Sequence, residues 1–158
     1  MRELAMQVLA ACRRNGLKLA TAESCTGGMV AAALTDIAGS SDVVERGFVV
    51  YSNQAKTEML GVPPALIARV GAVSEEVARA MAEGGLAHSG AEVCVAITGI
   101  AGPGGGTETK PVGLVHIACA RKGRGMVHER HVFPGDRAAV REASALRALE
   151  LVQQCASG

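Results

Sequence analysis

The sequence has almost no aromatic residues: its 158 residues include two Phe, one Tyr and no Trp. Proteins that bind single-stranded nucleic acids stack bases on aromatic side chains, so this scarcity argues against that class. The chain also lacks an excess of one charge, because 15 acidic residues offset its 16 basic ones. A basic surface is the usual footprint of a nucleic-acid-binding domain, and we therefore expect no nucleic acid among the partners.

Long apolar runs and paired cysteines are missing as well. No apolar stretch reaches the roughly 18 residues that would indicate a membrane span. Glu3 and Gln7 interrupt the amino-terminal segment, whose apolar residues fall at helical spacing instead of forming the continuous core of a secretion signal. The five cysteines are odd in number and include no CxxC spacing, which predicts neither a disulfide framework nor a zinc site. We expect a cytoplasmic protein without a membrane segment, metal or cofactor.

Short apolar segments alternate with segments of helical periodicity along the whole chain. Residues 93–98 are apolar throughout, as in a strand buried on both faces, whereas residues 126–133 are more polar and suit an edge strand. The short link before residue 126 predicts a hairpin, and therefore a mixed sheet. We predict one domain over residues 1–158, a three-layer α/β/α sandwich with a mixed, largely parallel sheet of about five strands. The expected strands are residues 17–21, 47–51, 93–98, 112–120 and 126–133; the expected helices are 4–12, 30–37, 53–60 with Asn53 as cap, a segment from Pro64, a segment after Ser74 and 136–154.

The segment TAESCTGG, residues 21–28, lies between an expected strand and an expected helix. In open α/β folds this junction lies at the sheet edge where binding sites are found, so the hydroxyl of Ser24 could act as a nucleophile. The N–H groups of the following residues, taken as the first helical turn, could stabilise an oxyanion. Two other interpretations stay open: Ser24 or Thr26 only caps the helix, or the thiol of Cys25 is the nucleophile.

A serine nucleophile needs a base, and none of the four histidines lies in a loop beside an orienting carboxylate. A lysine can take this role if its amine is neutral. Lys18 and Lys122 are expected in solvent, whereas Lys56 and Lys110 both lie near the expected site edge, so both remain candidates. A lysine pKa near 10.4 must fall by about three units for the amine to be neutral at pH 7, through burial or neighbouring cations. The candidate cations are Arg46, Arg137 and Arg141.

Several familiar site patterns are not completed. The glycine-rich loop, residues 99–111, has Thr107 where a dinucleotide-binding fingerprint needs its third glycine, and no Gly-Lys pair is present for a phosphate-binding P-loop. His128 and His131 are three residues apart on an expected strand, so they should face opposite sides and not share a metal.

The chain resembles the C-terminal domain of the competence-damage-inducible protein CinA in five segments that occur in the same order: TAESCTGG, DIAGSSDVVERGFVVYSNQAK, GAVSEEVA, TGIAGPGGGTETKPVG and FPGDR. The resemblance runs from about residue 4 to residue 153. Stand-alone members of this family are nicotinamide mononucleotide deamidases, which release nicotinic acid mononucleotide and ammonia in pyridine nucleotide recycling. The family uses a Ser/Lys pair; its AESCTGG serine matches Ser24, and its YSNxxK lysine matches Lys56.

The resemblance also implies a mechanism. Neutral Lys56 would take the proton of Ser24, whose oxygen attacks the amide carbon to give an acyl-enzyme, while N–H groups of Thr26, Gly27 and Gly28 stabilise the oxyanion. We expect nicotinamide mononucleotide as the small-molecule partner and, from family habit, a homo-oligomer. The alternative is a non-catalytic nucleotide-binding or partner-docking module. The expected substrate-binding residues are Tyr51 beside the pyridinium ring, Asn53, the backbone of Thr98, Gly99, Gly102, Gly104 and Gly105 around the phosphate, and Arg137.

Overall fold

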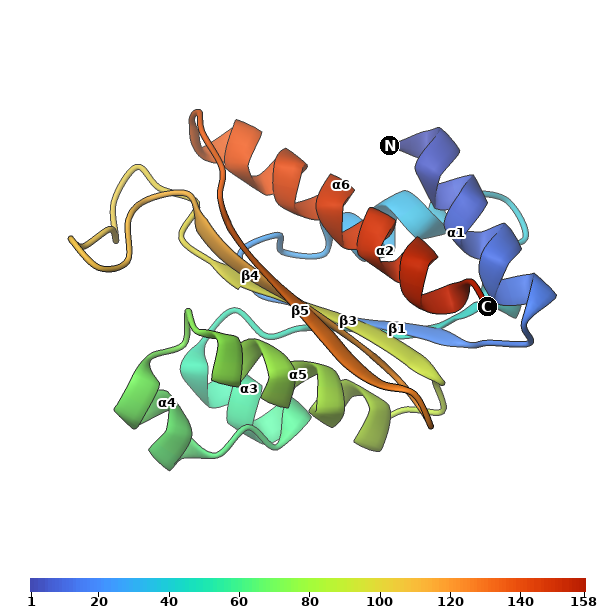
Figure 1. Ribbon diagram of the computed structural model, residues 1–158, viewed down its shortest axis with the longest axis horizontal. Coiled ribbons are helices and arrows are strands. Elements are labelled where there is room, and N and C mark those ends of the chain that lie inside the picture. Colours follow the sequence, from blue (N-terminus) through green and yellow to red (C-terminus); the bar gives the residue numbers. More distant parts are fainter.

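The computed structural model describes residues 1–158 as a five-stranded sheet between two layers of helices, which confirms the predicted three-layer sandwich (Figure 1). The strand order is β2-β1-β3-β4-β5. β1 pairs in parallel with β2 and β3, whereas β4 is antiparallel to both of its neighbours, so β4 alone runs against the other four strands. The mixed, largely parallel sheet is therefore confirmed. The strands are β1 (Leu19–Glu23), β2 (Val44–Val49), β3 (Val93–Gly99), β4 (Leu114–Arg121) and β5 (Gly125–Val132).

The helices divide between the two faces of the sheet (Figure 1). One face is covered by α1 (Arg2–Arg14), α2 (Met29–Thr35) and α6 (Arg137–Ala156), and the other by α3 (Asn53–Leu60), α4 (Pro64–Val70) and α5 (Glu75–Ala87). A short 3₁₀ helix, η1 (Ser40–Asp42), precedes β2. None of these helices is both long enough and apolar enough to cross a membrane.

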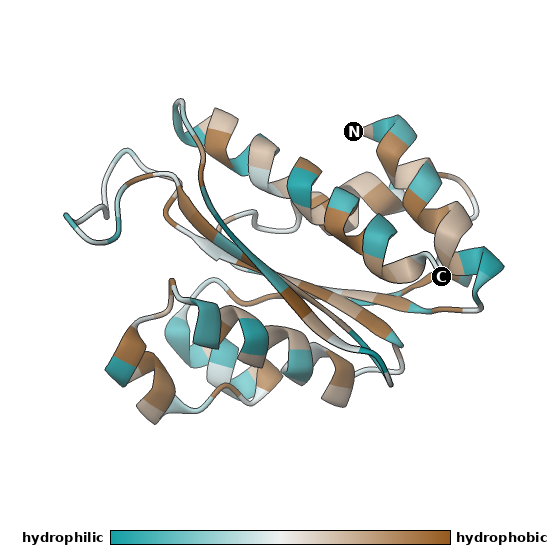
Figure 2. Cartoon of the chain, viewed as in Figure 1, coloured by the Kyte–Doolittle hydropathy of each residue, from teal (hydrophilic) through white to brown (hydrophobic).

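The central strand β3 is buried on both faces, as its continuous apolar run predicts. Val95 and Ile97 belong to the core under α1, α2 and α6, whereas Cys94 and Ala96 belong to the core under α3, α4 and α5. Figure 2 shows hydrophobic residues along the inner strands of the sheet, whereas β5 at its edge and α6 also carry hydrophilic residues. The sheet thus separates two apolar cores.

Side-chain caps fix where three of the helices begin. The hydroxyl of Ser74 accepts the N–H of Val77 at the start of α5, and the carboxylate of Asp136 accepts an N–H at the start of α6. The prediction that Asn53 caps α3 is wrong, because Asn53 is already the first helical residue and the hydroxyl of Ser52 accepts the N–H of Ala55 at 3.0 Å. This start places Lys56 in the first turn of α3.

Two adjacent glycines let α5 pack closely against its neighbours. A Cβ atom at Gly84 would overlap the carbonyl oxygen of Leu60 at the end of α3, and one at Gly85 would overlap the sulfur of Cys94 on β3. The first contact is with backbone, which cannot rotate away. Gly84 is therefore required by packing, although glycine weakens the helix itself.

We expect the substitution Gly84→Ala to destabilise the protein. Alanine improves helix propensity by about 1 kcal/mol. Overpacking costs about 1–3 kcal/mol, and the overlap with a backbone atom places this cost at about 2–3 kcal/mol, so the expected net loss is about 1–2 kcal/mol. Urea denaturation measures this free energy of unfolding. The matched control is Glu83→Ala at the neighbouring exposed position, which should change stability by less than about 0.5 kcal/mol. Equal or higher stability of Gly84→Ala would contradict the packing argument.

Candidate active site

A cavity of about 290 Å³ lies at the edge of the sheet where β1, β2 and β3 end. This is the edge at which open α/β folds place their sites. Thr26, Gly27 and Gly28 lie outside its lining. The structure brings the other predicted site residues together around it: Ser24, Tyr51, Asn53, Lys56, Thr98, Gly99, Gly102, Gly104, Gly105 and Arg137.

The amine of Lys56 contacts the hydroxyl of Ser24 inside this cavity. Nζ lies 3.1 Å from Ser24 Oγ, 3.0 Å from the carbonyl oxygen of Val50 and 3.5 Å from that of Tyr51. The side chain of Lys56 is only 2% exposed and forms no ion pair with a carboxylate. Lys110, the other candidate base, instead donates to the carbonyl of Val70 at 2.7 Å. Of the two lysines, only Lys56 contacts the serine.

Burial lowers the pKa of Lys56, because removing the amine from water disfavours its charged form. The cations considered from the sequence play no part in this shift. Arg46 pairs with Glu45 and donates to the carbonyl of His88, while Arg137 and Arg141 bind other groups of the site. The lowered pKa of Lys56 therefore has burial as its cause, and not a neighbouring positive charge.

Ser24 is not a helix cap, and Cys25 is not a thiolate. The N-cap of α2 is Gly28, which has no side chain, and the hydroxyl of Ser24 accepts no backbone N–H. Burial raises the pKa of the Cys25 thiol to about 11, so the sulfur is protonated near neutral pH. It packs in the core under α6. Of these two adjacent groups, only the hydroxyl has a base beside it.

The residues after Ser24 form a turn and not the first helical turn that the sequence predicts. We call residues 24–28 the nucleophile turn. Helix α2 begins only at Met29, and its N–H groups at Val30 and Ala31 donate to the carboxylate of Glu23, at 3.0 and 3.1 Å. These helical donors are therefore occupied. Sequence reasoning missed Glu23; the only available signal was a lone acidic residue at the end of an apolar strand.

Glu23 also ties the nucleophile turn to the helix. Its carboxylate is fully buried and accepts the hydroxyl of Thr26 at 2.6 Å. The N–H of Gly27 donates to the carbonyl of Ser24 at 3.0 Å, so Gly27 cannot donate to an oxyanion, contrary to the prediction. The N–H groups of Cys25, Thr26 and Gly28 have no hydrogen-bond partner, and the first two residues are buried. Buried N–H groups without a partner are rare in folded proteins.

The glycine-rich loop supplies a second set of free donors. The N–H groups of Gly102, Gly104 and Gly105 make no hydrogen bond within the protein, and these residues line the cavity. Gly102 and Gly105 have φ of +85° and +89°, which only glycine adopts easily. Neighbouring free N–H groups, such as those of Gly104 and Gly105, form concavities that bind anions. The hydroxyl of Thr98, by contrast, already donates to the carbonyl of Ala72 at 2.9 Å.

Arg137 joins this loop to the opposite rim of the cavity. Its guanidinium donates to the carbonyl of Gly102 at 2.8 Å and to the hydroxyl of Tyr51 at 2.9 Å. Tyr51 is 61% exposed, so its ring lies at the mouth of the cavity. Arg137 has five N–H donors, and these two contacts leave the others available for a ligand.

The histidines lie elsewhere. His128 contacts His116, at 2.9 Å, and Glu75 of α5, whereas His131 contacts Glu129. Burial lowers the pKa of His116 to about 4, so this ring is neutral near pH 7.

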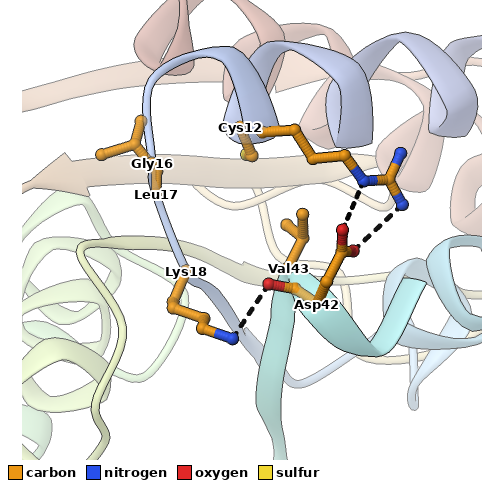
Figure 3. A pocket seen from close by; sticks show the side chains of 7 residues that line it. Cys12, Gly16, Leu17, Lys18, Asp42 and Val43 are labelled. Carbon is orange, nitrogen blue, oxygen red and sulfur yellow. Dashed lines mark hydrogen bonds and ion pairs between the residues drawn. The ribbon is translucent and has the colours of Figure 1, made fainter. Parts of the chain in front are cut away.

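A second cavity, of about 400 Å³, lies at the opposite edge of the sheet, before β1 and β2 begin (Figure 3). Its charged groups satisfy one another. Arg13 donates twice to the carboxylate of Asp42, and the amine of Lys18 donates to the carbonyl of Asp42 at 2.9 Å. Burial raises the pKa of the Cys12 thiol in this cavity to about 11, and the amine of Lys18 is bound to Asp42. The cavity around Ser24 is therefore the stronger candidate.

Comparison with known proteins agrees with this assignment of the fold. A family model described as the CinA C-terminal domain matches residues 1–156. The chain is 56% identical over 133 residues to a CinA-like protein of Akkermansia muciniphila, covering 84% of this chain and 32% of that protein. It is 55% identical over 143 residues to a CinA-like protein of Mycolicibacterium vanbaalenii, covering 90% of this chain and 34% of that protein. The chain thus spans about a third of the length of these curated relatives.

Two crystal structures have the same fold. A competence/damage inducible protein, CihA, from Agrobacterium tumefaciens is 48% identical, with a TM-score of 0.93 over 96% of this chain and 92% of that one. A competence-damaged protein (CinA) superfamily protein from Klebsiella pneumoniae is 36% identical, with a TM-score of 0.93 over 98% of this chain and 96% of that one.

The buried amine makes stability depend on pH in a defined direction. In the unfolded chain, Lys56 has an ordinary pKa near 10.4. Between its lowered folded pKa and that value, the unfolded state binds more protons, so the free energy of unfolding rises with pH. We therefore expect wild-type stability to rise relative to that of Lys56→Met as the pH increases from about 7 to about 10, measured by urea denaturation.

The control for this experiment is Lys122→Met, because the side chain of Lys122 is exposed in a hairpin turn. The stability difference between wild type and this control should stay constant over the same pH range. A constant or falling difference between wild type and Lys56→Met would show that the folded state does not disfavour the ammonium form.

Proposed function

Because the chain belongs to the CinA C-terminal domain family, we propose that it is an amidohydrolase that converts nicotinamide mononucleotide to nicotinic acid mononucleotide and ammonia, in pyridine nucleotide recycling. The observation that carries the proposal is the 3.1 Å contact between the buried amine of Lys56 and the hydroxyl of Ser24. A hydroxyl nucleophile next to a base is the arrangement that acyl-enzyme chemistry requires.

The carbonyls around Lys56 support its role as the base. A neutral amine has two N–H bonds and one lone pair. The carbonyl oxygens of Val50 and Tyr51, at 3.0 and 3.5 Å, can only accept, so they take the two N–H groups. The lone pair is then directed at Ser24, whose O–H donates to it. Backbone acceptors thereby favour the orientation in which Lys56 can remove the proton.

The reaction proceeds in two stages. Lys56 takes the proton of Ser24 as the oxygen bonds to the carboxamide carbon, and the oxyanion that forms accepts the free N–H groups of Cys25 and Thr26. A well-placed donor of this kind contributes about 3–4 kcal/mol to transition-state stabilisation. Lys56 returns the proton to the departing ammonia. Water then attacks the nicotinoyl ester, with Lys56 again as base, and releases Ser24.

The glycine-rich loop and Arg137 bind the phosphate in this proposal. The free N–H groups of Gly102, Gly104 and Gly105 form the anion-binding concavity, and the unused donors of Arg137 add a charged contact. Asn53 and Tyr51 also line the cavity. Tyr51 offers a ring face to the positively charged pyridinium.

The alternative function is a nucleotide-binding or partner-docking module without catalysis. It is favoured by the length of the CinA-like relatives, in which a domain like this one makes up about a third of the protein. It predicts that nicotinamide mononucleotide raises the melting temperature without releasing ammonia.

Incubation with nicotinamide mononucleotide should release ammonia, and Ser24→Ala and Lys56→Met should each reduce kcat by about 10³-fold or more, because the two side chains act as a unit. A coupled ammonia assay measures the rate, and circular dichroism checks the fold. The matched control is Lys110→Met, which removes the other lysine considered as a base and should retain activity. Full activity of either dyad variant, or loss of activity in the control alone, would contradict the assignment.

Removing the phosphate from the substrate should mainly affect binding. We expect the KM of wild type for nicotinamide riboside to exceed that for the mononucleotide by about 10-fold or more, since a charge-assisted bidentate contact is lost. Arg137→Gln should raise the KM for the mononucleotide and leave the KM for the riboside nearly unchanged. The ratio of the riboside KM to the mononucleotide KM should therefore be smaller than in wild type. Arg124→Gln, in the exposed hairpin turn, is the control. An unchanged ratio in Arg137→Gln would limit Arg137 to its contacts with Tyr51 and Gly102.

A further inference from the structure

Arg141 contacts the nucleophile turn from the side of α6. Its Nε lies 3.1 Å from the carbonyl oxygen of Cys25, and its Nη2 lies 3.3 Å from that of Thr26. It forms no ion pair with a carboxylate. A Cβ atom at Gly27 would lie 3.4 Å from Nη2, so the guanidinium packs directly on the turn. A charged side chain is thus committed to two backbone carbonyls.

These contacts fix the direction of one of the free N–H groups. In a trans peptide the carbonyl and the N–H of one unit point in opposite directions. The carbonyl of Cys25 and the N–H of Thr26 share such a unit, because the only cis peptide in the chain is at Pro103. Since Arg141 holds the carbonyl of Cys25, the N–H of Thr26 points away from α6.

The neighbouring peptide unit, between Ser24 and Cys25, is also held through its carbonyl, but by a donor within the turn. The N–H of Cys25 shares its peptide unit with the carbonyl of Ser24, which accepts the N–H of Gly27 at 3.0 Å. The second carbonyl bound by Arg141, that of Thr26, belongs to the unit that supplies this Gly27 donor. Arg141 therefore holds one of the two units with a buried, unpartnered N–H group directly, and the other through the hydrogen bond of Gly27.

We propose that Arg141 is a positioning residue for the oxyanion site: it sets the direction of the N–H group of Thr26 and strengthens it as a donor by polarising its peptide unit, and it fixes the N–H group of Cys25 indirectly, through the hydrogen bond from Gly27 to Ser24. This inference rests on the proposed acyl-enzyme function of Ser24. Arg141 does not touch the substrate. It differs in this from Arg137, one helical turn earlier, which lines the cavity itself.

The test uses phenylmethanesulfonyl fluoride, which probes the serine without the natural substrate. The oxygen of Ser24 bonds to sulfur, the S–F bond breaks, fluoride leaves, and the serine proton passes to Lys56 and then to solvent. Charge develops on the sulfonyl oxygens, which need the same donors as a carbonyl oxyanion. Mass spectrometry gives the rate and site of labelling, and Ser24→Ala should not be labelled.

We expect labelling of Arg141→Met to be about 10- to 100-fold slower than wild type, since small misplacements of catalytic groups cost that much. The kcat for ammonia release should fall in parallel, with KM changed less than about threefold, because Arg141 does not touch the substrate. The matched control is Arg147→Met on the same helix, which loses its ion pairs with Glu129 and Glu150 but should label at the wild-type rate.

Three results would overturn the inference: a wild-type labelling rate in folded Arg141→Met, an equal slowing in Arg147→Met, or no labelling of wild-type Ser24. If Arg141→Met does not fold, Arg141→Lys decides, because a lysine keeps the charge but cannot donate to both carbonyls in the planar geometry of a guanidinium. A wild-type rate in Arg141→Lys would then overturn the inference, and a slower rate would support it. Labelling of wild type without ammonia release would reject the proposed substrate and leave Arg141 to be judged on labelling alone.

Discussion

The site depends on a lysine amine that is buried without a counter-ion. Burial of Lys56 disfavours the ammonium form, and two backbone carbonyls compensate part of the lost hydration. The same carbonyls also link the amine to the sheet. The N–H of Val50 donates to the carbonyl of Glu23 at 2.9 Å, while the carbonyl of Val50 accepts Lys56. The residue directly after β2 thereby couples Lys56 to the residue before Ser24, and the distance between Lys56 and Ser24 follows from the pairing of β1 with β2.

Opposite charges hold the nucleophile turn from its two sides. The carboxylate of Glu23 accepts hydrogen bonds from the hydroxyl of Thr26 and from the first N–H groups of α2. The guanidinium of Arg141 donates to two carbonyls of the turn. In many α/β proteins the start of a helix is itself the anion site. Here a carboxylate of the protein occupies that place, and in the proposed mechanism the oxyanion uses the turn instead. The free N–H groups of Cys25 and Thr26 are consistent with that use.

The sheet, its layers of helices and most of the individual helices could be predicted from the sequence, because apolar residues repeat with different periods in strands and in helices. From the sequence alone, Lys56 and Lys110 were equivalent candidates for the base, because their distances from Ser24 depend on the strand order and on the path of the loop after β3. The family resemblance selected Lys56. The structure places the amine of Lys110 against the carbonyl of Val70. Ser52 and Asn53 are both favourable N-cap residues, so propensity alone could not show which of them caps α3. The late start of α2 was missed because Gly27 and Gly28 both have positive φ, which a periodic pattern does not reveal.

The mixed topology itself explains how the last helix reaches the site. The parallel strands β1, β2 and β3 all end at the site edge, where the segments that follow them carry Ser24, Lys56 and the glycines. β4 runs away from that edge, and the hairpin at residues 122–124 turns the chain so that β5 runs back to it. Helix α6 therefore starts beside the cavity, next to the glycine-rich loop (Figure 1), and presents Arg137 to the rim and Arg141 to the turn. A connection from β4 to a strand parallel to it would have needed a long crossover, usually a helix. The hairpin reverses the chain within three residues, and α6 then begins at the site edge with Arg137 and Arg141.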